Sequence, residues 1–195
     1  MTLPEAAEGG SGALHRLPSV EEAGHGGIVG SGDGTGLRLA LVCSRFNSQV
    51  TDRLLAGALA ELGRRGVAEA DRNVVWVSGA FELPLGALTA ARTGRYDAVV
   101  CLGAVIRGET SHYDFVAGQC AAGIQQVQLE TGLPVVFGVL TTENLEQALA
   151  RAGGTKGDKG ADAALTAIEM VSVLRRLSQT GVGGAHRFGG AGRAE

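Results

Sequence analysis

The chain has 195 residues, of which 45% are hydrophobic and 19% charged, and its formal net charge is −3. This length and composition predict one globular domain, and the mildly acidic balance without a basic tract disfavours binding to nucleic acid or to a membrane surface. No apolar run is long enough to span a bilayer. The N-terminus shows no basic segment followed by an apolar one, the pattern of a secretory signal peptide, so we expect a cytoplasmic protein.

The two ends of the chain differ in composition from its middle. Residues 1–35 are rich in Gly, Ala, Ser and Glu without helical or strand periodicity, so we expect a mostly disordered extension. Within it, Ile28 and Val29 form a candidate short strand that adds to the sheet of a neighbouring subunit. Residues 179–195 are expected to be a flexible tail, which leaves residues 36–178 as the folded domain.

Candidate strands and helices alternate through that domain. Short apolar runs predict strands at residues 37–43, 73–77, 97–102 and 134–140. Apolar residues at helical spacing predict helices at residues 49–65, 82–93, 111–130, 142–150 and 162–177. Thr142 or its neighbour is expected to cap the fourth helix, and residues 151–159 are expected to form a flexible basic loop with three cations close together.

Apolar strands that are each followed by a helix predict a parallel sheet with both faces covered. Right-handed crossovers then give a three-layer α/β/α sandwich, a doubly wound, flavodoxin-like fold with a four-stranded parallel sheet. In such a sheet every strand-to-helix loop emerges at one edge. We therefore expect residues 44–47, 78–82, 104–112 and 141–142 to converge there, where ligands bind.

Two of these loops carry an aromatic ring beside a polar side chain. Phe46 offers a flat apolar face to a planar heterocycle, although a ring tucked under the next helix is the alternative. Asn47 can both donate and accept hydrogen bonds, and Phe81 repeats the arrangement of Phe46. Glu82 is either an acceptor for sugar-like hydroxyls or a cap of its own helix.

The loop after the third strand carries residues suited to an anion and to proton transfer. Gly108, Glu109 and Thr110 precede a long helix, where free amides can cradle a phosphate or serve as a plain cap. His112, in the first turn, is a candidate proton carrier or a surface histidine without a task. The basic segment that begins at Arg151 is either an anion clamp or a solvated turn.

Other common chemistries lack their motifs. No G-x-x-x-x-G-K-[ST] or G-x-S-x-G sequence occurs, and the glycines of residues 24–36 precede the first strand, so a generic nucleotide-binding domain is disfavoured. Cys43, Cys101 and Cys120 lie among apolar neighbours without zinc-ligand spacing, which predicts buried reduced thiols and no metal site.

Several motifs, taken in order, resemble the 6,7-dimethyl-8-ribityllumazine synthase family. They are Arg45-Phe46-Asn47, Gly79-Ala80-Phe81-Glu82-Leu83-Pro84, GAVIRGETSHYD at 103–114, FGVLTTEN at 137–144, and Arg151-Ala152-Gly153 with Lys159-Gly160. The resemblance implies a transferase of riboflavin biosynthesis that needs no metal or organic cofactor. Its reaction condenses a 5-amino-6-ribitylaminopyrimidinedione with 3,4-dihydroxy-2-butanone 4-phosphate, releasing phosphate and water.

The resemblance also implies a role for each matching residue. Phe46 would stack on the pyrimidine, Glu82 would hold the ribityl chain, and His112 would carry the proton. The pyrimidine would also contact Asn47, Ala80, Val105 and Ile106, largely through backbone, and Phe81 would be a further substrate-binding residue. Glu109 and Thr110 would bind phosphate through main-chain amides, and Arg151 would grip it. Phe137, Arg151 and Lys159 would come from a neighbouring subunit, although the altered segment 153–159 leaves open whether Lys156 or Lys159 reaches the site.

The family also implies an assembly and leaves one alternative. The implied homo-oligomer is a pentamer or a sixty-subunit icosahedral shell of pentamers, with riboflavin synthase as a candidate partner. The alternative is a non-catalytic lumazine- or flavin-binding shell protein on the same scaffold. It predicts loss of the histidine or of the phosphate clamp, and the presence of His112, Arg151 and Lys159 argues against it.

Overall fold

The computed structural model describes residues 27–179 and confirms the four-stranded parallel sheet. The strands are β1 (Leu39–Ser44), β2 (Arg72–Val77), β3 (Ala98–Ile106) and β4 (Val135–Thr142). Their order in the sheet is β2-β1-β3-β4, with every neighbouring pair parallel. This is the order of a flavodoxin-like, doubly wound sheet, so the predicted fold class is confirmed.

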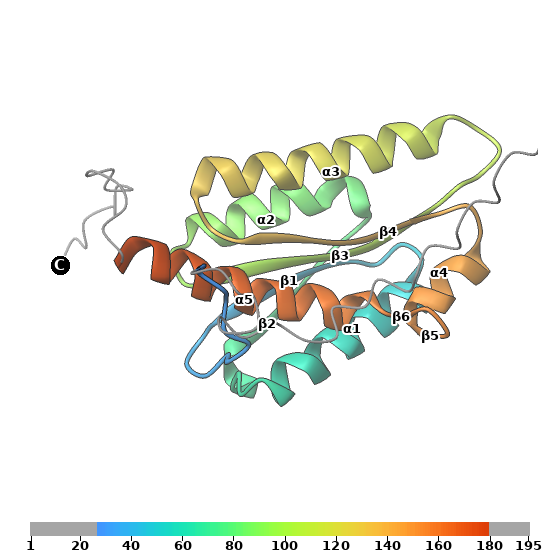
Figure 1. The fold of residues 1–195 in the computed structure, drawn as a ribbon. Coiled ribbons are helices and arrows are strands. Elements are labelled where there is room, and N and C mark those ends of the chain that lie inside the picture. Colours follow the sequence, from blue (N-terminus) through green and yellow to red (C-terminus); the bar gives the residue numbers. More distant parts are fainter. Residues whose placement is uncertain (1–26, 180–195) are drawn as a thin grey trace, which may run out of the picture.

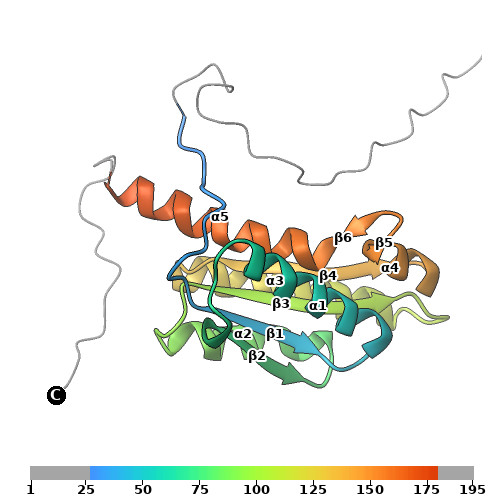
Figure 2. The ribbon, with the colours of Figure 1, turned by 90° about the horizontal axis from the view of Figure 1, so that it is seen from below.

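Helices cover both faces of the sheet (Figure 1). The helices are α1 (Ser48–Arg64), α2 (Leu83–Arg92), α3 (His112–Thr131), α4 (Leu145–Arg151) and α5 (Lys159–Gln179), and the short 3-10 turns η1 (Glu69–Asp71) and η2 (Ala80–Glu82) precede β2 and α2. Figure 2 shows α1 and α5 side by side over one face, and α2 and α3 cover the other. Because side chains alternate along each strand, each face of the sheet has its own core. The core on the face covered by α1 and α5 includes Leu41, Leu54 and Ile168.

The third strand is longer than the sequence pattern predicts. β3 pairs with β4 as far as Ile106 and Thr142, so Val105, Ile106, Thr141 and Thr142 belong to strands and not to the loops expected there. β1 pairs with β3 only as far as Leu102. The last four residues of β3 therefore extend past its last pair with β1, and three of them, Ala104, Val105 and Ile106, form one wall of the space described below.

The segment after α4 is also different from the expectation. Residues 151–159 do not form a flexible loop, because β5 (Ala152–Gly154) and β6 (Gly157–Asp158) pair as an antiparallel hairpin. Oδ1 of Asp158 accepts hydrogen bonds from the backbone N–H groups of Gly160 (2.9 Å) and Ala161 (3.2 Å), which caps α5. A side chain at Gly160 would collide with the carbonyl of Leu54, and one at Gly57 would collide with the Asp158 carboxylate. These two glycines let the hairpin and the start of α5 lie directly on α1.

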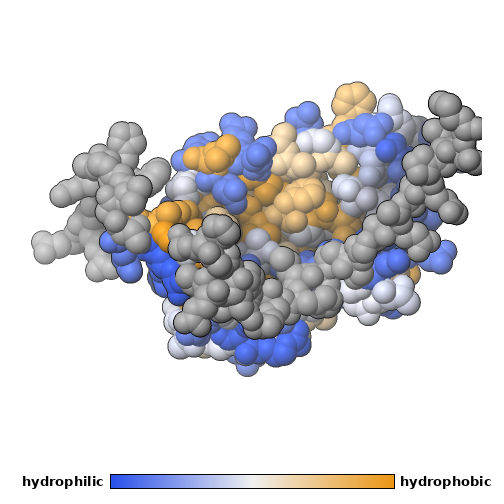
Figure 3. Space-filling view, viewed as in Figure 1, coloured by the Kyte–Doolittle hydropathy of each residue, from blue (hydrophilic) through white to orange (hydrophobic). Residues whose placement is uncertain are grey.

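Both outer edges of the sheet carry exposed apolar side chains in the single chain. On β2 these are Val74, Val75 and Trp76, and on β4 Phe137 is 42% exposed. Figure 3 shows apolar surface along the middle of the molecule, over β4 and between α3 and α5. Exposed apolar edges of this kind are typical of surfaces that meet another chain.

The described part of the N-terminal segment lies against α1 and α5. The backbone N–H of Ser31 donates to Oγ of Ser172 (2.9 Å), and that of Gly34 donates to the carbonyl of Arg65 (2.7 Å). Ile28 and Val29 form no strand within this chain, so their pairing with a neighbour stays a prediction, as do the domain boundaries. Of the expected extension (residues 1–35) and tail (residues 179–195), residues 1–26 and 180–195 lie outside the described residues. Between residues 27 and 179, no helix is both long and apolar enough to cross a membrane.

Candidate functional site

The loops that follow β1, β2 and β3 surround a cavity of about 630 Å³ at the carboxyl ends of the strands. The structure brings together nine of the predicted site residues as its lining: Phe46, Asn47, Ala80, Phe81, Glu82, Val105, Ile106, Thr110 and His112. A cavity of this size is in the range that holds a small molecule. Three of the four loops predicted to converge thus line one cavity, whereas Thr141 and Thr142, which belong to β4, do not line it.

The loop after β1 presents an aromatic ring to the cavity. Phe46 is 70% exposed in the single chain, so it is not tucked under α1. Backbone hydrogen bonds from Arg45 and Phe46 to the carbonyls of Val77 and Ser78 extend the contact with β2 and fix the loop. The ring is therefore held by its backbone and left free to stack on a ligand.

Asn47 closes the same loop with its side chain. Its backbone is left-handed, with φ 60° and ψ 44°, at the N-cap of α1. Nδ2 of Asn47 donates a 2.8 Å hydrogen bond to the carbonyl of Ala104, in the part of β3 that extends past β1. Part of the hydrogen-bonding capacity expected for a ligand therefore stabilises the wall of the cavity.

The loop after β2 holds Glu82 in a capping position. Oε2 of Glu82 accepts a 2.9 Å hydrogen bond from the backbone N–H of Gly79, at the start of the 3-10 turn η2. An ionised carboxylate has about four acceptor sites, so this bond leaves Oε1 able to accept from a ligand. The two alternatives for Glu82 are therefore compatible, because the residue caps its turn and also lines the cavity.

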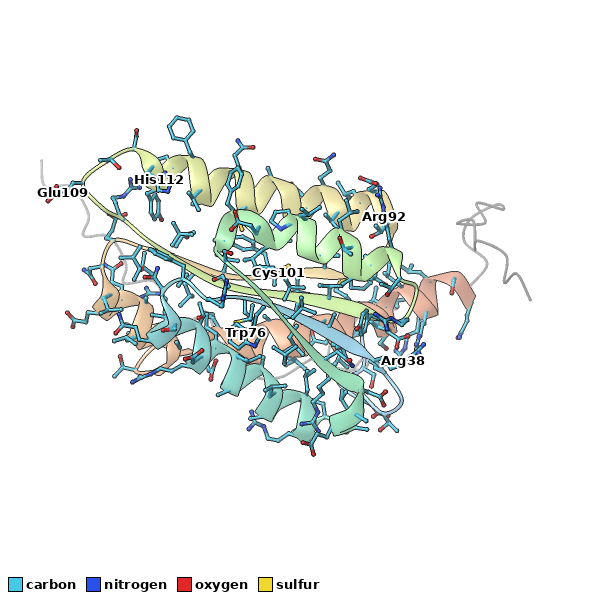
Figure 4. The ribbon with its side chains drawn as sticks, turned by 180° about the vertical axis from the view of Figure 1, so that it is seen from behind. Arg38, Trp76, Arg92, Cys101, Glu109 and His112 are labelled. Atoms are coloured by element: carbon cyan, nitrogen blue, oxygen red, sulfur yellow. The ribbon has the colours of Figure 1, made fainter. Side chains whose placement is uncertain are left out.

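The loop after β3 provides amides and a histidine at the start of a long helix. Thr110 and His112 line the cavity, whereas Glu109 does not and lies at the outer end of the loop (Figure 4). The N-cap residue of α3, Ser111, makes no side-chain capping bond. The N–H of Asp114 donates to the carbonyl of Ser111 (3.0 Å), so an anion bound at this helix start would use the amides that precede it.

Three lining residues on α3 had no role in the sequence analysis. Tyr113, Phe115 and Val116 lie on the first turns of α3 and close the cavity on that side. Phe115 and Val116 stand three and four positions after His112, which is the spacing of one helical face. That spacing is the signal that would have identified them from the sequence.

The other predicted residues lie away from this cavity in the single chain. Nη1 of Arg151 donates to the carbonyl of Gln147 (3.0 Å), and Nζ of Lys159 lies 2.8 Å from Oδ2 of Asp162. Arg151 is the last residue of α4 and Lys159 the first of α5, and both helices lie on the α1 side of the sheet. Phe137 lies on the edge strand β4. Since none of them lines the cavity of its own chain, their contribution from a neighbouring subunit stays a prediction.

The cysteines take no part in the cavity. Burial raises the pKa of the Cys43 and Cys120 thiols to about 12, and burial also raises that of Cys101. All three are free thiols in the core, as predicted. Within residues 27–179, no group of three or more His, Cys, Asp or Glu side chains is placed to hold a metal ion.

Comparison with known protein families supports the resemblance seen in the motifs. A family model described as 6,7-dimethyl-8-ribityllumazine synthase matches residues 36–175. The matched stretch runs from just before β1 through most of α5 and contains every predicted site residue.

Proposed function

Because the chain belongs to the 6,7-dimethyl-8-ribityllumazine synthase family, we propose that it catalyses the reaction for which the family is named. The ribitylaminopyrimidinedione condenses with 3,4-dihydroxy-2-butanone 4-phosphate through imine formation, loss of phosphate and ring closure. The observation that carries the proposal is the cavity itself, where aromatic rings, a carboxylate, helix N-terminal amides and a histidine meet at one sheet edge.

Each part of the cavity suits one part of the substrates. The exposed rings of Phe46 and Phe81 suit the flat pyrimidine. Oε1 of Glu82 suits the ribityl hydroxyls, which donate hydrogen bonds. The amides at the start of α3, beside Glu109 and Thr110, suit the phosphate. We propose that this division brings the amine of one substrate beside the carbonyl of the other.

His112 is the residue that we assign to proton transfer. It lines the cavity at the helix start where the phosphate would bind. Imine formation and ring closure both need protons moved to and from nitrogen and oxygen, which a neutral imidazole can do. Holding the reactants together contributes an entropic share of the rate that does not depend on this side chain.

We propose that the site is completed by a neighbouring subunit in a homopentamer. Phe137, Arg151 and Lys159 lie outside the cavity of their own chain, and both sheet edges carry exposed apolar side chains. A head-to-tail ring would bring these residues to the next cavity, with Arg151 as the phosphate clamp. A sixty-subunit shell, a cytoplasmic location and riboflavin synthase as a partner are further predictions from the family.

The direct test mixes both substrates with the purified chain and follows lumazine absorbance and fluorescence. We expect turnover by the wild type and a loss of about 100-fold or more in kcat for His112→Ala, without abolition, because acid–base catalysis typically contributes that much. Ligand binding without turnover would instead favour a non-catalytic carrier. Unaltered turnover in His112→Ala would contradict the proton role.

Subunit mixing tests the shared site. Phe46→Ala and Arg151→Ala chains, each weakly active alone, are unfolded together and reassembled in equal amounts. In a randomly mixed ring, about a quarter of the sites take Phe46 from an Arg151→Ala chain and Arg151 from a neighbouring Phe46→Ala chain. These sites are intact, so about a quarter of the wild-type activity should return. No recovery on mixing would show that both residues act within one chain.

A further inference from the structure

Arg107 is the first residue after β3, and its side chain joins three parts of the rim around the cavity. Nη1 lies 3.2 Å from Oδ1 of Asp114, and Nε lies 2.9 Å from Oε2 of Glu143. The guanidinium carbon lies 4.0 Å from the centre of the Tyr113 ring, where a cation is attracted to the ring face. The end of β3, the first turn of α3 and the β4–α4 loop therefore meet at this one side chain.

The backbone of Arg107 is anchored to the sheet. Its N–H donates a 2.9 Å hydrogen bond to the carbonyl of Thr142, next to the last pair of the β3–β4 ladder. The chain leaves the sheet at Gly108. The guanidinium group thus starts from a fixed point and reaches across the loop to the helix.

The segment between Arg107 and the helix has weak local bonds. Ser111 at the N-cap makes no side-chain capping bond, and the His112 N–H lies 3.4 Å from Oγ1 of Thr110, which is long for a hydrogen bond. The two residues that follow His112 are the ones that Arg107 holds, one by its ring and one by its carboxylate. These contacts tie the turn that carries His112 to the sheet.

Arg107 does not itself face the cavity. Ile106 and Gly108 line it, whereas Arg107 between them does not. Its charge is already matched by Asp114 and Glu143. An arginine flanked by two carboxylates is poorly suited to attract a phosphate, so its role is on the protein and not on the substrate.

We propose that Arg107 is a positioning residue that holds the first turn of α3 so that His112 faces the bound reactants. The catalytic consequence rests on the proposed function, whereas the positioning is a property of the chain without ligand. A displacement of about 1 Å at a catalytic group can cost on the order of 100-fold in rate. Loosening this turn should therefore lower kcat more than it weakens substrate binding.

The first test compares three variants of the assembled protein. Arg107→Gln removes the charge, and Arg107→Lys keeps the charge but can reach only one carboxylate at a time. Arg92→Gln is the matched control, because it removes an ion pair with Glu130 at the opposite end of α3 (Figure 4).

We expect Arg107→Gln to lower kcat by about 10- to 100-fold with the KM for each substrate nearly unchanged. Arg107→Lys should fall between Arg107→Gln and the wild type, and Arg92→Gln should match the wild type. Equal kcat values for Arg107→Gln and Arg92→Gln would overturn the proposal.

A double variant distinguishes positioning from direct contact with phosphate. If Arg107 acts through His112, adding Arg107→Gln to His112→Ala should cause little further loss of kcat. If the two losses instead multiply, and the KM for the butanone phosphate rises, Arg107 is a phosphate ligand and the positioning role is wrong.

Amide hydrogen exchange tests the positioning without any turnover. Arg107→Gln should speed exchange at residues 109–114 and leave the far end of α3 unchanged, because only the first turn loses its tie. Unchanged exchange at residues 109–114 would overturn the proposal. Faster exchange in a chain that makes no lumazine would leave the positioning in place and refute the proposed function instead.

Discussion

Asn47 combines a left-handed backbone with a side-chain hydrogen bond, and two substitutions separate these contributions. Within residues 27–179 it is the one non-glycine residue at positive φ. Its side-chain amide donates a hydrogen bond to the carbonyl of Ala104, just past the point where β1 stops pairing with β3. Losing the residue should therefore loosen both the Phe46 loop and the projecting end of β3.

The structure allows the size of each effect to be worked out. Asn47→Ala loses a hydrogen bond worth about 1 kcal/mol and places alanine in a left-handed conformation that costs about 1 kcal/mol more, so we expect a loss of about 2 kcal/mol. Asn47→Gly loses the same bond but has no left-handed penalty. Its greater freedom in the unfolded chain adds about 0.5 kcal/mol to the lost bond, which gives a loss of about 1.5 kcal/mol, smaller than that of Asn47→Ala.

Urea unfolding measures the difference. The variants are compared at one protomer concentration, because the stability of an oligomer depends on concentration, and an unchanged m-value is required before midpoints are compared. Asn73→Ala is the control, since Asn73 is exposed and its amide makes only a 3.4 Å contact, and we expect a change within about 0.5 kcal/mol. An Asn47→Gly chain no more stable than Asn47→Ala would refute the backbone argument, and two variants as stable as the wild type would refute the hydrogen bond.

The remaining predictions concern the cysteines, the cap of α5 and one partly buried carboxyl. Burial raises the pKa of the thiols, to about 12 for Cys43 and Cys120. A thiol reagent at pH 8 should therefore label no cysteine in the native protein and all three after unfolding. Fast labelling of the native protein would contradict their burial. Asp158→Ala should cost about 1 kcal/mol in urea unfolding, and Asp158→Asn, which keeps an acceptor for the α5 amides, should cost much less. Burial raises the pKa of Glu169, whose Oε1 has no hydrogen-bond partner. Glu169 therefore stays protonated to a higher pH in the folded state than in the unfolded state, and its ionisation lowers the free energy of unfolding as pH rises above 4.5. We expect Glu169→Gln, which cannot ionise, to raise Tm at pH 7 but not at pH 3.5. An equal Tm difference at both pH values would exclude the charge as the cause.

The sequence predicted the layers well because each strand and helix has its own periodic signal. The boundary of β3 was wrong for a tertiary reason. Val105 and Ile106 are held in the sheet by pairing with Thr141 and Thr142, and such pairing between distant segments leaves no mark at the end of an apolar run. The hairpin at 152–158 was missed because its glycines and lysines resemble a flexible loop. Its order comes from Asp158 and from contact with α1, which the local sequence does not reveal.

Most of the predicted site residues in the loops line the cavity, with Glu109 as the exception, since parallel topology brings the loops that follow the strands together. Phe46, Glu82 and His112 all line it. The hydrogen bond of Asn47 to the backbone was not foreseen, because it depends on how far β3 extends beyond β1. The residues expected from another subunit are the part for which one chain provides no test.

Gly57 and Gly160 have a consequence for how this protein tolerates sequence change. They contribute no functional group, yet the absence of their side chains sets how near the hairpin and the start of α5 lie to α1. A methyl group at either position would push the segment carrying Arg151 and Lys159 outward. The placement of two cations on the molecular surface is thus governed from interior positions that a search for polar functional residues would pass over.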